Sequence, residues 1–357
     1  MFHKTRRKFT VLFAALAATC LLLVPGCGSD SSSDEKPLIV VTTNILGDVV
    51  SKAVGDVFNV ETIMPPGADP HVFQASAKQV DKMMQADLLV VNGANFEEGL
   101  LDVVEAAKLD GVKIFEAMSA VDPLAEQEDN HDDHDDHEGH DDHDDHEGHD
   151  DHDKEEGHDD HDDHEGHDDH DDHEGHDHGG VDPHFFTDPG RMAQAVEQLS
   201  EFLVLNFPEV DEKDLVSNMT NYSKKLEDLD NEVMQTLSSI SADSRVLITN
   251  HQVFAYFAES YEFEILGTII PTASTLSNTS AKDLVDLAEK MKDEGVKAIF
   301  VDNSSSDALA NALAGELDGV EVVNLFSESL GPEDSAGSTY IDMVRTNSEL
   351  IAGALTG

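Results

Sequence analysis

Cysteine is nearly absent from this chain of 357 residues, which holds only Cys20 and Cys27. Cys20 lies in an apolar segment that has the build of a signal peptide, and Cys27 follows directly after that segment. A mature protein that begins at Cys27 therefore has no disulfide, even though it is exported. Its stability must come from the burial of an apolar core.

Basic residues are scarce as well. The chain has 21 Lys and Arg against 76 Asp and Glu, which gives a formal net charge of −55. Such an acidic surface repels nucleic acid and anionic lipid, so neither is expected as a partner. Residues 131–178 hold 26 of the acidic residues and one Lys, and the rest of the chain is still strongly acidic.

A long apolar run is also missing. Residues 10–24, TVLFAALAATCLLLV, follow a basic start and are too short for a stable membrane span. The segment ends in VPGC, which resembles the cleavage site of a bacterial lipoprotein. We expect a lipoprotein signal peptide over 1–27, a lipid anchor at Cys27 and a flexible tether over 28–37. The protein would then be periplasmic or lie on the cell surface. An ordinary secretory signal with an incidental Cys27 is the alternative.

Strand-like and helix-like segments alternate along the rest of the chain. This alternation predicts parallel sheets with helices on both faces, which is an α/β fold. The predicted strands are Leu38–Thr42, Phe58–Met64, Leu88–Val91, Val112–Phe115, Val246–Thr249, Glu264–Ile270, Ala298–Val301 and Val320–Leu325. The predicted helices are Ile45–Val54, Ala77–Gln85, Phe96–Ala107, Ser280–Glu294, Asp307–Glu316 and Ser338–Leu355.

The two sets of strands predict two lobes, one over 38–208 and the other over 244–357. Between them, residues 211–240 contain neither Gly nor Pro and carry apolar residues at helical spacing. We expect one long helix there, which joins the lobes and limits hinge motion between them.

A nine-residue repeat, HDDHDDHEG, fills the middle of the chain, within a loop that we place at 129–179. The repeat has almost nothing apolar to bury, so it is not expected to fold on its own. Neutral imidazole binds Zn, Cu, Ni and Co well, which makes the segment metal-binding in character. A solvated acidic spacer is the alternative. The imidazoles belong to His131, His134, His137, His140, His143, His146, His149, His152, His158, His161, His164, His167, His170, His173, His176 and His178.

Three other histidines stand just before predicted helices. His71 and His184 share the phrase Asp-Pro-His followed by an apolar or aromatic residue, and His251 directly follows a predicted strand. In open α/β sheets, ligands bind at the carboxyl ends of the strands, where such loops meet. The Asp of each phrase, Asp69 or Asp182, is expected either to orient nearby groups or to cap a helix.

Several stretches resemble the zinc and manganese solute-binding proteins of ABC importers, the cluster A-I or ZnuA-type family. They are PPGADPHVF, VDPHFFTDP, ITNHQVFAYFAESYEFEILG, STLSNTSAKDLVDLAEKMKDEGVKAIFVDNS and GSTYIDMVRTN, and the match runs from about Leu38 to the C-terminus. The resemblance implies two α/β lobes, a rigid linking helix and a metal in the cleft between the lobes. It also implies a membrane permease as partner, and we expect the receptor to be a monomer.

The resemblance further implies four metal ligands: His71, His184, His251 and Glu328. The family often has Asp at the fourth position, so Glu328 is a departure, and in some zinc members a water molecule takes that place. Manganese-type members carry Glu at the third position. Three imidazoles suit Zn²⁺, so zinc is the expected ligand and manganese the alternative.

Two other classes of function compete with a transport receptor. A zinc hydrolase would use Glu328 as general base, but the sequence has no HExxH, G-x-S-x-G or P-loop motif, and we expect no enzyme. A surface metal buffer or cell-adhesion protein would use the His-rich loop as its working part and the lobes as a scaffold. The cleft ligands argue against that reading. As a receptor, the protein would use the loop to collect zinc or to sense it.

Overall fold

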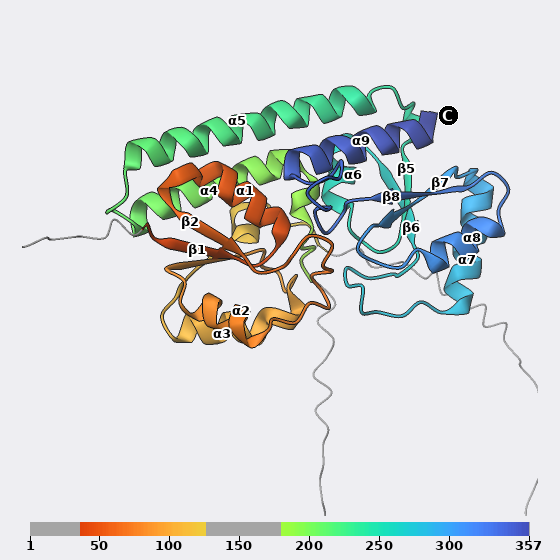
Figure 1. The fold of residues 1–357 in the computed structure, drawn as a ribbon. Coiled ribbons are helices and arrows are strands. Elements are labelled where there is room, and N and C mark those ends of the chain that lie inside the picture. The colour runs from red at the N-terminus through yellow and green to blue at the C-terminus, as the bar shows by residue number, and fades with distance from the viewer. Residues whose placement is uncertain (1–35, 126–179, 357) are drawn as a thin grey trace, which may run out of the picture. The chain divides into compact units, whose positions relative to one another are not determined.

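Two four-stranded parallel sheets organise the part of the chain that the structure describes, residues 36–125 and 180–356 of a computed structural model (Figure 1). The first sheet has the order β2-β1-β3-β4 and the second the order β6-β5-β7-β8. The predicted α/β class is therefore confirmed. The strands are β1 (Leu38–Val41), β2 (Asn59–Thr62), β3 (Leu88–Val91), β4 (Lys113–Glu116), β5 (Val246–Thr249), β6 (Glu264–Thr268), β7 (Ala298–Asp302) and β8 (Glu321–Leu325).

The central strands are apolar on both faces because helices cover both faces of each sheet. Every residue of β3 and of β7 is buried. The helices are α1 (Asn44–Val54), α2 (Ala77–Met84), α3 (Leu101–Leu109), α4 (Pro189–Asn206), α5 (Glu212–Leu237), α6 (Ala255–Tyr261), α7 (Ala281–Glu294), α8 (Ala308–Gly315) and α9 (Tyr340–Thr356). Figure 1 shows α2 and α3 on one side of the first sheet, with α1 and α4 on the other.

Short polar side chains fix where several helices begin. The hydroxyl of Thr43 accepts a hydrogen bond from the backbone of Leu46 and starts α1 directly after β1. Ser76 and Ser280 each form a capping box, at the starts of α2 and α7. Asp188 caps α4, whose first residue is proline.

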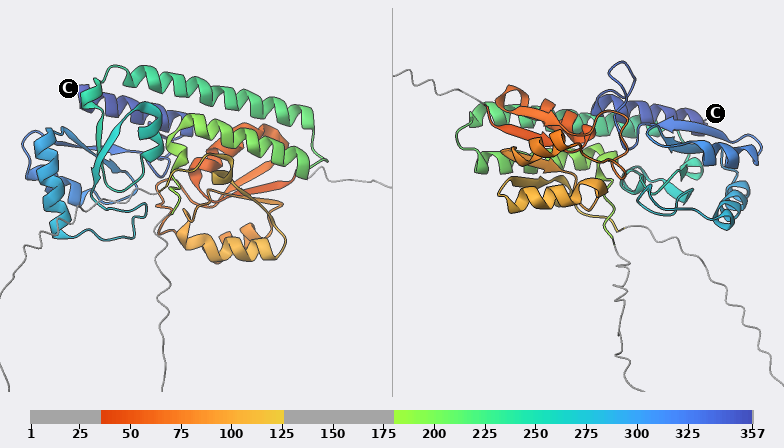
Figure 2. Two further views of the ribbon diagram at one scale, coloured as in Figure 1. Left: turned by 180° about the vertical axis from the view of Figure 1, so that it is seen from behind. Right: turned by 60° about the horizontal axis from the view of Figure 1, so that its bottom comes forward.

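The long helix α5 is amphipathic, and its apolar stripe lies inside the protein. Figure 2 shows α5 running alongside both sets of strands, with α4 and α9 beside it. The buried stripe consists of Leu215, Met219, Tyr222, Leu226, Leu229, Val233 and Leu237. One hydrophobic cluster extends from the first sheet through α4, α5 and α9 to the second sheet, so the two lobes share a core. Two smaller clusters lie on the outer faces of the two sheets.

The two ends of the segment 126–179 are held together where they join the fold. Ala125 and Val181 form an antiparallel bridge, and the backbone N–H of Asp182 donates to the carbonyl of Leu124 at 2.9 Å. The hydroxyl of Tyr256, on α6, accepts from the backbone N–H of Leu124 at 3.0 Å and donates to the carbonyl of Asp182 at 2.8 Å. Both ends are thus anchored to the same tyrosine.

None of the helices in residues 36–125 and 180–356 has the length and apolar character needed to cross a membrane.

The paired ends predict that the fold does not need the segment between them. Replacing residues 126–179 with a single Asn leaves Asn-Gly180 between the bridge partners Ala125 and Val181, and Asn-Gly favours a tight two-residue turn. We expect the metal-free variant to unfold within about 3 °C of the metal-free full chain in a thermal melt followed by circular dichroism. A much larger drop in the unfolding temperature would show that the segment contributes to the stability of the fold.

Candidate metal centre

Four side chains converge between the carboxyl ends of the two sheets. They belong to His71, His184, His251 and Glu328, and one potential ligand atom from each lies within 4.8 Å of all the others. The Oε1 atom of Glu328 is 3.0 Å from Nε2 of His71, 3.1 Å from Nε2 of His184 and 2.9 Å from Nε2 of His251. All four residues are buried, and His184 and His251 have no exposed surface.

The topology explains why these four residues meet. His71 lies on the loop that follows β2, and His184 lies beyond the end of β4, just before α4. His251 comes two residues after β5, and Glu328 comes three residues after β8. All the strands of a parallel sheet end at the same edge, so the loops of each lobe gather there, as ligand-binding loops do in open α/β folds.

His71 is oriented by groups of its own lobe. The carboxylate of Asp69 accepts a hydrogen bond from the backbone N–H of His71 at 2.9 Å. The ring atom Nδ1 of His71 lies 3.1 Å from Oε1 of Glu98. The ring of Phe96 packs edge-on against the imidazole, with the centroids 5.1 Å apart. These contacts leave Nε2 as the atom that faces Glu328.

A single carboxylate orients both the backbone and the ring of His184. Oδ1 of Asp182 accepts from the backbone N–H of His184 at 2.8 Å and lies 2.8 Å from its Nδ1 atom. The side-chain amide of Asn92 donates to the carbonyl of Pro183 at 2.9 Å and fixes the preceding peptide. A proton on Nδ1 then leaves Nε2 free to bind a metal.

His251 is held through its backbone. The hydroxyl of Thr249 donates to the carbonyl of His251 at 2.7 Å, and the next residue, Gln252, donates its N–H to the carbonyl of Thr272 at 3.0 Å. Within residues 36–125 and 180–356, neither Nδ1 of His251 nor Oε2 of Glu328 has a hydrogen-bond partner, although both are buried.

The charges of the cluster depend on each other. Burial would raise the pKa of Glu328, but His251 and then His71 lower it well below its usual value. Burial would lower the pKa of His184, but Asp182 and Glu328 raise it to about 9. The pKa of His71 is also raised, because Glu328 outweighs the effect of burial. The carboxylate of Glu328 is therefore favoured in its ionised form, and the rings of His71 and His184 hold a proton more strongly than a free imidazole does.

Contacts between the lobes lie on two sides of the cluster. The hydroxyl of Ser329 accepts from the amide of Asn44 and from the backbone N–H of Gly67, both at 2.8 Å. On the other side, the hydroxyl of Thr275 donates to the second carboxylate oxygen of Asp69 at 2.8 Å. An open groove beside Thr275 reaches His71 and has Glu98 and Ser274 in its walls.

The structure brings together the four side chains that were predicted as ligands. It adds two neighbours that the sequence did not indicate, and the two aspartates of the Asp-Pro-His phrases make different contacts. Asp182 contacts the ring of its histidine, whereas Asp69 contacts only the backbone of His71 and the other lobe. The carboxylate beside the ring of His71 belongs to Glu98, and Phe96 packs against two of the histidines. Neither Glu98 nor Phe96 was singled out from the sequence, and no local pattern marks them. Cys27 and the histidines from His131 to His178 lie outside the described residues.

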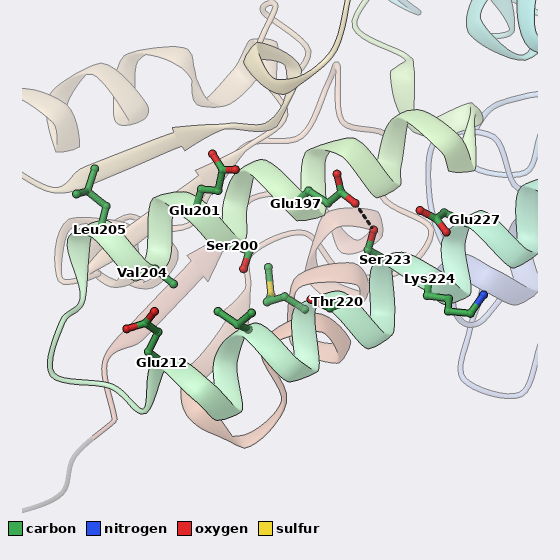
Figure 3. A pocket seen from close by; sticks show the side chains of 12 residues that line it. Glu197, Ser200, Glu201, Val204, Leu205, Glu212, Thr220, Ser223, Lys224 and Glu227 are labelled. Carbon is green, nitrogen blue, oxygen red and sulfur yellow. Dashed lines mark hydrogen bonds between the residues drawn. The ribbon is translucent and has the colours of Figure 1, made fainter.

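A second hollow has a lining that differs chemically from the histidine cluster. It runs between α4 and α5 (Figure 3), where Glu197 accepts a hydrogen bond from Ser223 at 3.2 Å. Its lining combines acidic side chains with small polar and aliphatic ones, and none of its 12 lining residues is a histidine or cysteine. The imidazole nitrogens that a metal such as Zn²⁺ prefers are therefore found at the interlobe cluster and not in this hollow.

Three nitrogen ligands and one carboxylate oxygen form a donor set that suits four-coordinate Zn²⁺. The four donor atoms are close enough to surround one ion, and two of the imidazoles have carboxylate partners on their other nitrogen, which fixes the ring and its tautomer. The arrangement can hold a divalent cation out of contact with bulk water.

Known proteins are similar to this chain in both sequence and fold. A family model described as zinc-uptake complex component A, periplasmic (ZnuA), matches residues 39–354. The zinc-binding protein TroA of Treponema pallidum is 28% identical over 332 residues, which cover 91% of this chain and 91% of TroA. The manganese-binding lipoprotein MntA of Bacillus subtilis is 26% identical over 353 residues, which cover 97% of each chain.

A solved structure described as the periplasmic zinc binding protein TroA from Treponema pallidum has the same two-lobed fold. Its TM-score to this chain is 0.69 at 25% identity, and the alignment covers 90% of this chain and all of that one. These relatives divide between zinc and manganese in the metal that their names state.

The raised pKa of His184 predicts that metal binding strengthens as the pH rises. Below its pKa of about 9 the ring carries a proton on Nε2 that a metal must displace. In the metal-free protein, the charged ring of His184 stabilises the folded state. This contribution to the free energy of unfolding is fully present below the ordinary pKa of 6.5 and is lost as the pH rises through about 9. We therefore expect the apparent zinc affinity to rise by at least about tenfold per pH unit near neutrality and to level off near the raised pKa of His184.

Competition with a chelator of known pH dependence measures this slope. Asp182→Asn is the matched variant, because it removes the strongest of the charges that raise the pKa of His184. The affinity of that variant should level off at a lower pH. A zinc affinity that does not change between about pH 6 and pH 8 would contradict the assignment of the proton.

Proposed function

The chain belongs to the family of the zinc-uptake complex component A, and from this premise we propose that it captures Zn²⁺ outside the cytoplasm and delivers it to an ABC-type importer. Proteins of this family are metal-binding receptors that act with the permease of an ABC transporter, and they are not enzymes. Our proposal concerns three points: the choice of zinc, the residues that bind it, and the role of the His-rich loop.

The buried set of three histidines and one glutamate carries the proposal. Three imidazoles with a single carboxylate supply a donor set richer in nitrogen than Mn²⁺ prefers, and borderline metals such as Zn²⁺ favour it. We assign His71, His184, His251 and Glu328 as the ligands. A manganese receptor remains the second candidate, because a manganese-binding lipoprotein is among the relatives.

The N-terminal sequence supports an anchored receptor. Relatives include metal-binding lipoproteins, one of which is described as the substrate-binding lipoprotein of a manganese ABC transporter. We propose that residues 1–27 are the signal peptide, that Cys27 carries the lipid, and that residues 28–37 tether the receptor to a membrane. We further propose that it acts as a monomer of two lobes, 38–208 and 244–357, joined by the helix within 211–240. One receptor would then present one ion to its permease.

The His-rich loop joins the fold beside the groove that reaches His71. Gly180 and Val181, at the end of the loop, line that groove together with His71 itself. We propose that the loop is an accessory collector or sensor of zinc, with many exchangeable sites of modest affinity. Residues 129–179 would raise the local supply of metal, and the buried cluster would be the site from which the importer receives the ion.

Isothermal titration of two proteins separates the two kinds of site. We expect the full mature chain to bind several Zn²⁺ ions, and the variant with residues 126–179 replaced by Asn to keep one tight site. His184→Ala in that variant should weaken the tight site by at least about 100-fold, because it removes a direct ligand. If His184→Ala leaves the tight event unchanged, the ligands have been assigned wrongly. If the shortened variant has no tight site, the His-rich loop is the working part of a buffer protein.

The choice between zinc and manganese needs a measurement of uptake. Almost any nitrogen-containing site binds Zn²⁺ more tightly than Mn²⁺, so affinity alone does not identify the transported metal. We expect cells that lack the gene to lose high-affinity uptake of radioactive zinc and to keep that of manganese. A gene carrying His184→Ala should fail to restore zinc uptake. Loss of manganese uptake instead would establish the manganese receptor.

A further inference from the structure

The strand β7 lies between the two strands that lead to the metal ligands of the second lobe. In the order β6-β5-β7-β8, β5 leads to His251 and β8 leads to Glu328. The last residue of β7 is Asp302, which is 1% exposed. A carboxylate at this place is costly to bury unless several donors satisfy it, and the donors that surround it indicate its role.

Asp302 accepts hydrogen bonds from two loops at once. Its Oδ2 atom accepts from the backbone N–H groups of Ser327 and Glu328, both at 2.9 Å, and from the hydroxyl of Ser327 at 2.6 Å. Its Oδ1 atom accepts from the backbone N–H of Ser304 at 2.7 Å and also from the hydroxyl of that residue. One buried side chain therefore joins the turn after β7 to the peptide of Glu328.

We propose that Asp302 is a positioning residue that holds Glu328 as a ligand through one oxygen, and that it thereby favours four-coordinate Zn²⁺ over metals of higher coordination number. The inference rests on the proposed function, and it assigns the specificity of that site to a side chain that does not touch the metal.

The position of Glu328 supports a single-oxygen contact. Its Oε1 atom is 2.9–3.1 Å from all three imidazole nitrogens, whereas its Oε2 atom has no hydrogen-bond partner in the described part of the chain. The backbone around Glu328 is held at two places: Asp302 accepts from the N–H of Glu328, and Asn44 bonds to the two residues that follow it. Asn44 donates to Ser329 at 2.8 Å and accepts from the N–H of Leu330 at 2.7 Å. Without Asp302, one side of this support is lost and Oε2 is free to turn toward the metal.

The turn after β7 is also linked to the segment of His251. The side-chain amide of Asn250 donates to the hydroxyl of Ser305 at 3.2 Å, and its backbone N–H donates to the carbonyl of Phe300 at 3.1 Å. Asp302 therefore lies in a chain of contacts that runs from the residue before His251 to Glu328. It sets the separation of the two ligands that the second lobe contributes.

The first lobe uses the corresponding position for the same purpose. The strand β3 occupies the place in its sheet that β7 occupies in the second sheet, and Asn92 follows it directly. Asn92 donates its side-chain amide to the carbonyl of Pro183, next to His184. The chemistry differs because the target differs: a carbonyl needs a donor such as an amide, and the N–H groups at Ser327 and Glu328 need an acceptor such as a carboxylate.

Asp302→Asn tests the proposal in the variant whose residues 126–179 are replaced by Asn. The amide has only one acceptor oxygen, so it cannot accept from Ser304 and from the peptide of Glu328 at the same time. The bridge between the two loops is therefore broken, while the size of the side chain is kept. The matched control is Asp307→Asn, which changes an exposed carboxylate on the segment that follows the same strand.

The readouts are zinc affinity, manganese affinity and the visible spectrum of bound Co²⁺, which reports the coordination number. We expect the parent and Asp307→Asn to give the intense spectrum of a four-coordinate site. Asp302→Asn should give a weaker spectrum, bind zinc about 10–100-fold more weakly and bind manganese with a smaller loss. The preference for zinc over manganese should therefore fall by about tenfold, which a general loss of stability would not produce.

The result that overturns the proposal is a folded Asp302→Asn protein with the spectrum and the metal preference of the parent. If that variant does not fold, Ser327→Ala decides, because it removes only the hydroxyl bond at 2.6 Å to Oδ2 of Asp302. A smaller change in the Co²⁺ spectrum and in the preference for zinc over manganese, in the same direction, supports the proposal. If neither changes, the proposal is overturned. A parent protein without a tight zinc site would instead refute the proposed function itself.

Discussion

The convergence of three imidazole nitrogens on one oxygen of Glu328 is the interaction on which the rest of the site depends. A buried carboxylate is stable only when donors or opposite charges surround it, and here those groups come from both lobes. The same atoms that bind protons in the metal-free state are the ones that a divalent ion would take over. Protons and a bound metal would therefore compete for the same atoms, and the carboxylates of Asp182 and Glu98 contact the other ring nitrogens of His184 and His71.

The shared hydrophobic core limits how far the lobes can move apart. Apolar residues on α4, α5 and α9 form one cluster with residues of both sheets. A wide hinge opening would expose part of that cluster to water, which is unfavourable in proportion to the apolar area uncovered. Under the proposed function, discrimination between metals would then depend on small adjustments of the ligands and on the residues that hold the ligand loops.

The sequence predicts most of the strands, and it places the three histidines on loops whose side chains meet in the structure, because these signals are local. β3 and β5 match their predicted bounds, since continuous apolar runs mark strands that are covered on both faces. The edge strand β2 is shorter than predicted, and both of its end residues, Asn59 and Thr62, are exposed. The helix predicted from Phe96 begins only at Leu101. Ala94 and Asn95 adopt left-handed backbone angles there, and the carboxylate of Glu97 accepts from Asn92 and Thr42.

Glu98 and Asp302 could not be found in this way, because their roles arise from contacts 27 and 26 residues away along the chain. Glu328 was assigned from a resemblance and not from a local pattern. A charged residue that ends a fully buried strand, as Asp302 does, is nevertheless a signal that sequence reasoning can use. Such a residue must find donors in neighbouring loops, and in a parallel sheet those loops lie beside the binding site.

The hydroxyl of Tyr256 bonds to Leu124 and to Asp182, at the two ends of the inserted segment. This arrangement has a consequence for how the length of that segment can change during evolution. The bridge of Ala125 and Val181 predicts that the fold requires only that the two ends of the inserted segment meet there. Repeats of nine residues can be gained or lost by unequal recombination without disturbing the register of any strand. The number of histidines outside the buried site would then be free to change, while the four buried side chains stay held by the packing of both lobes around them.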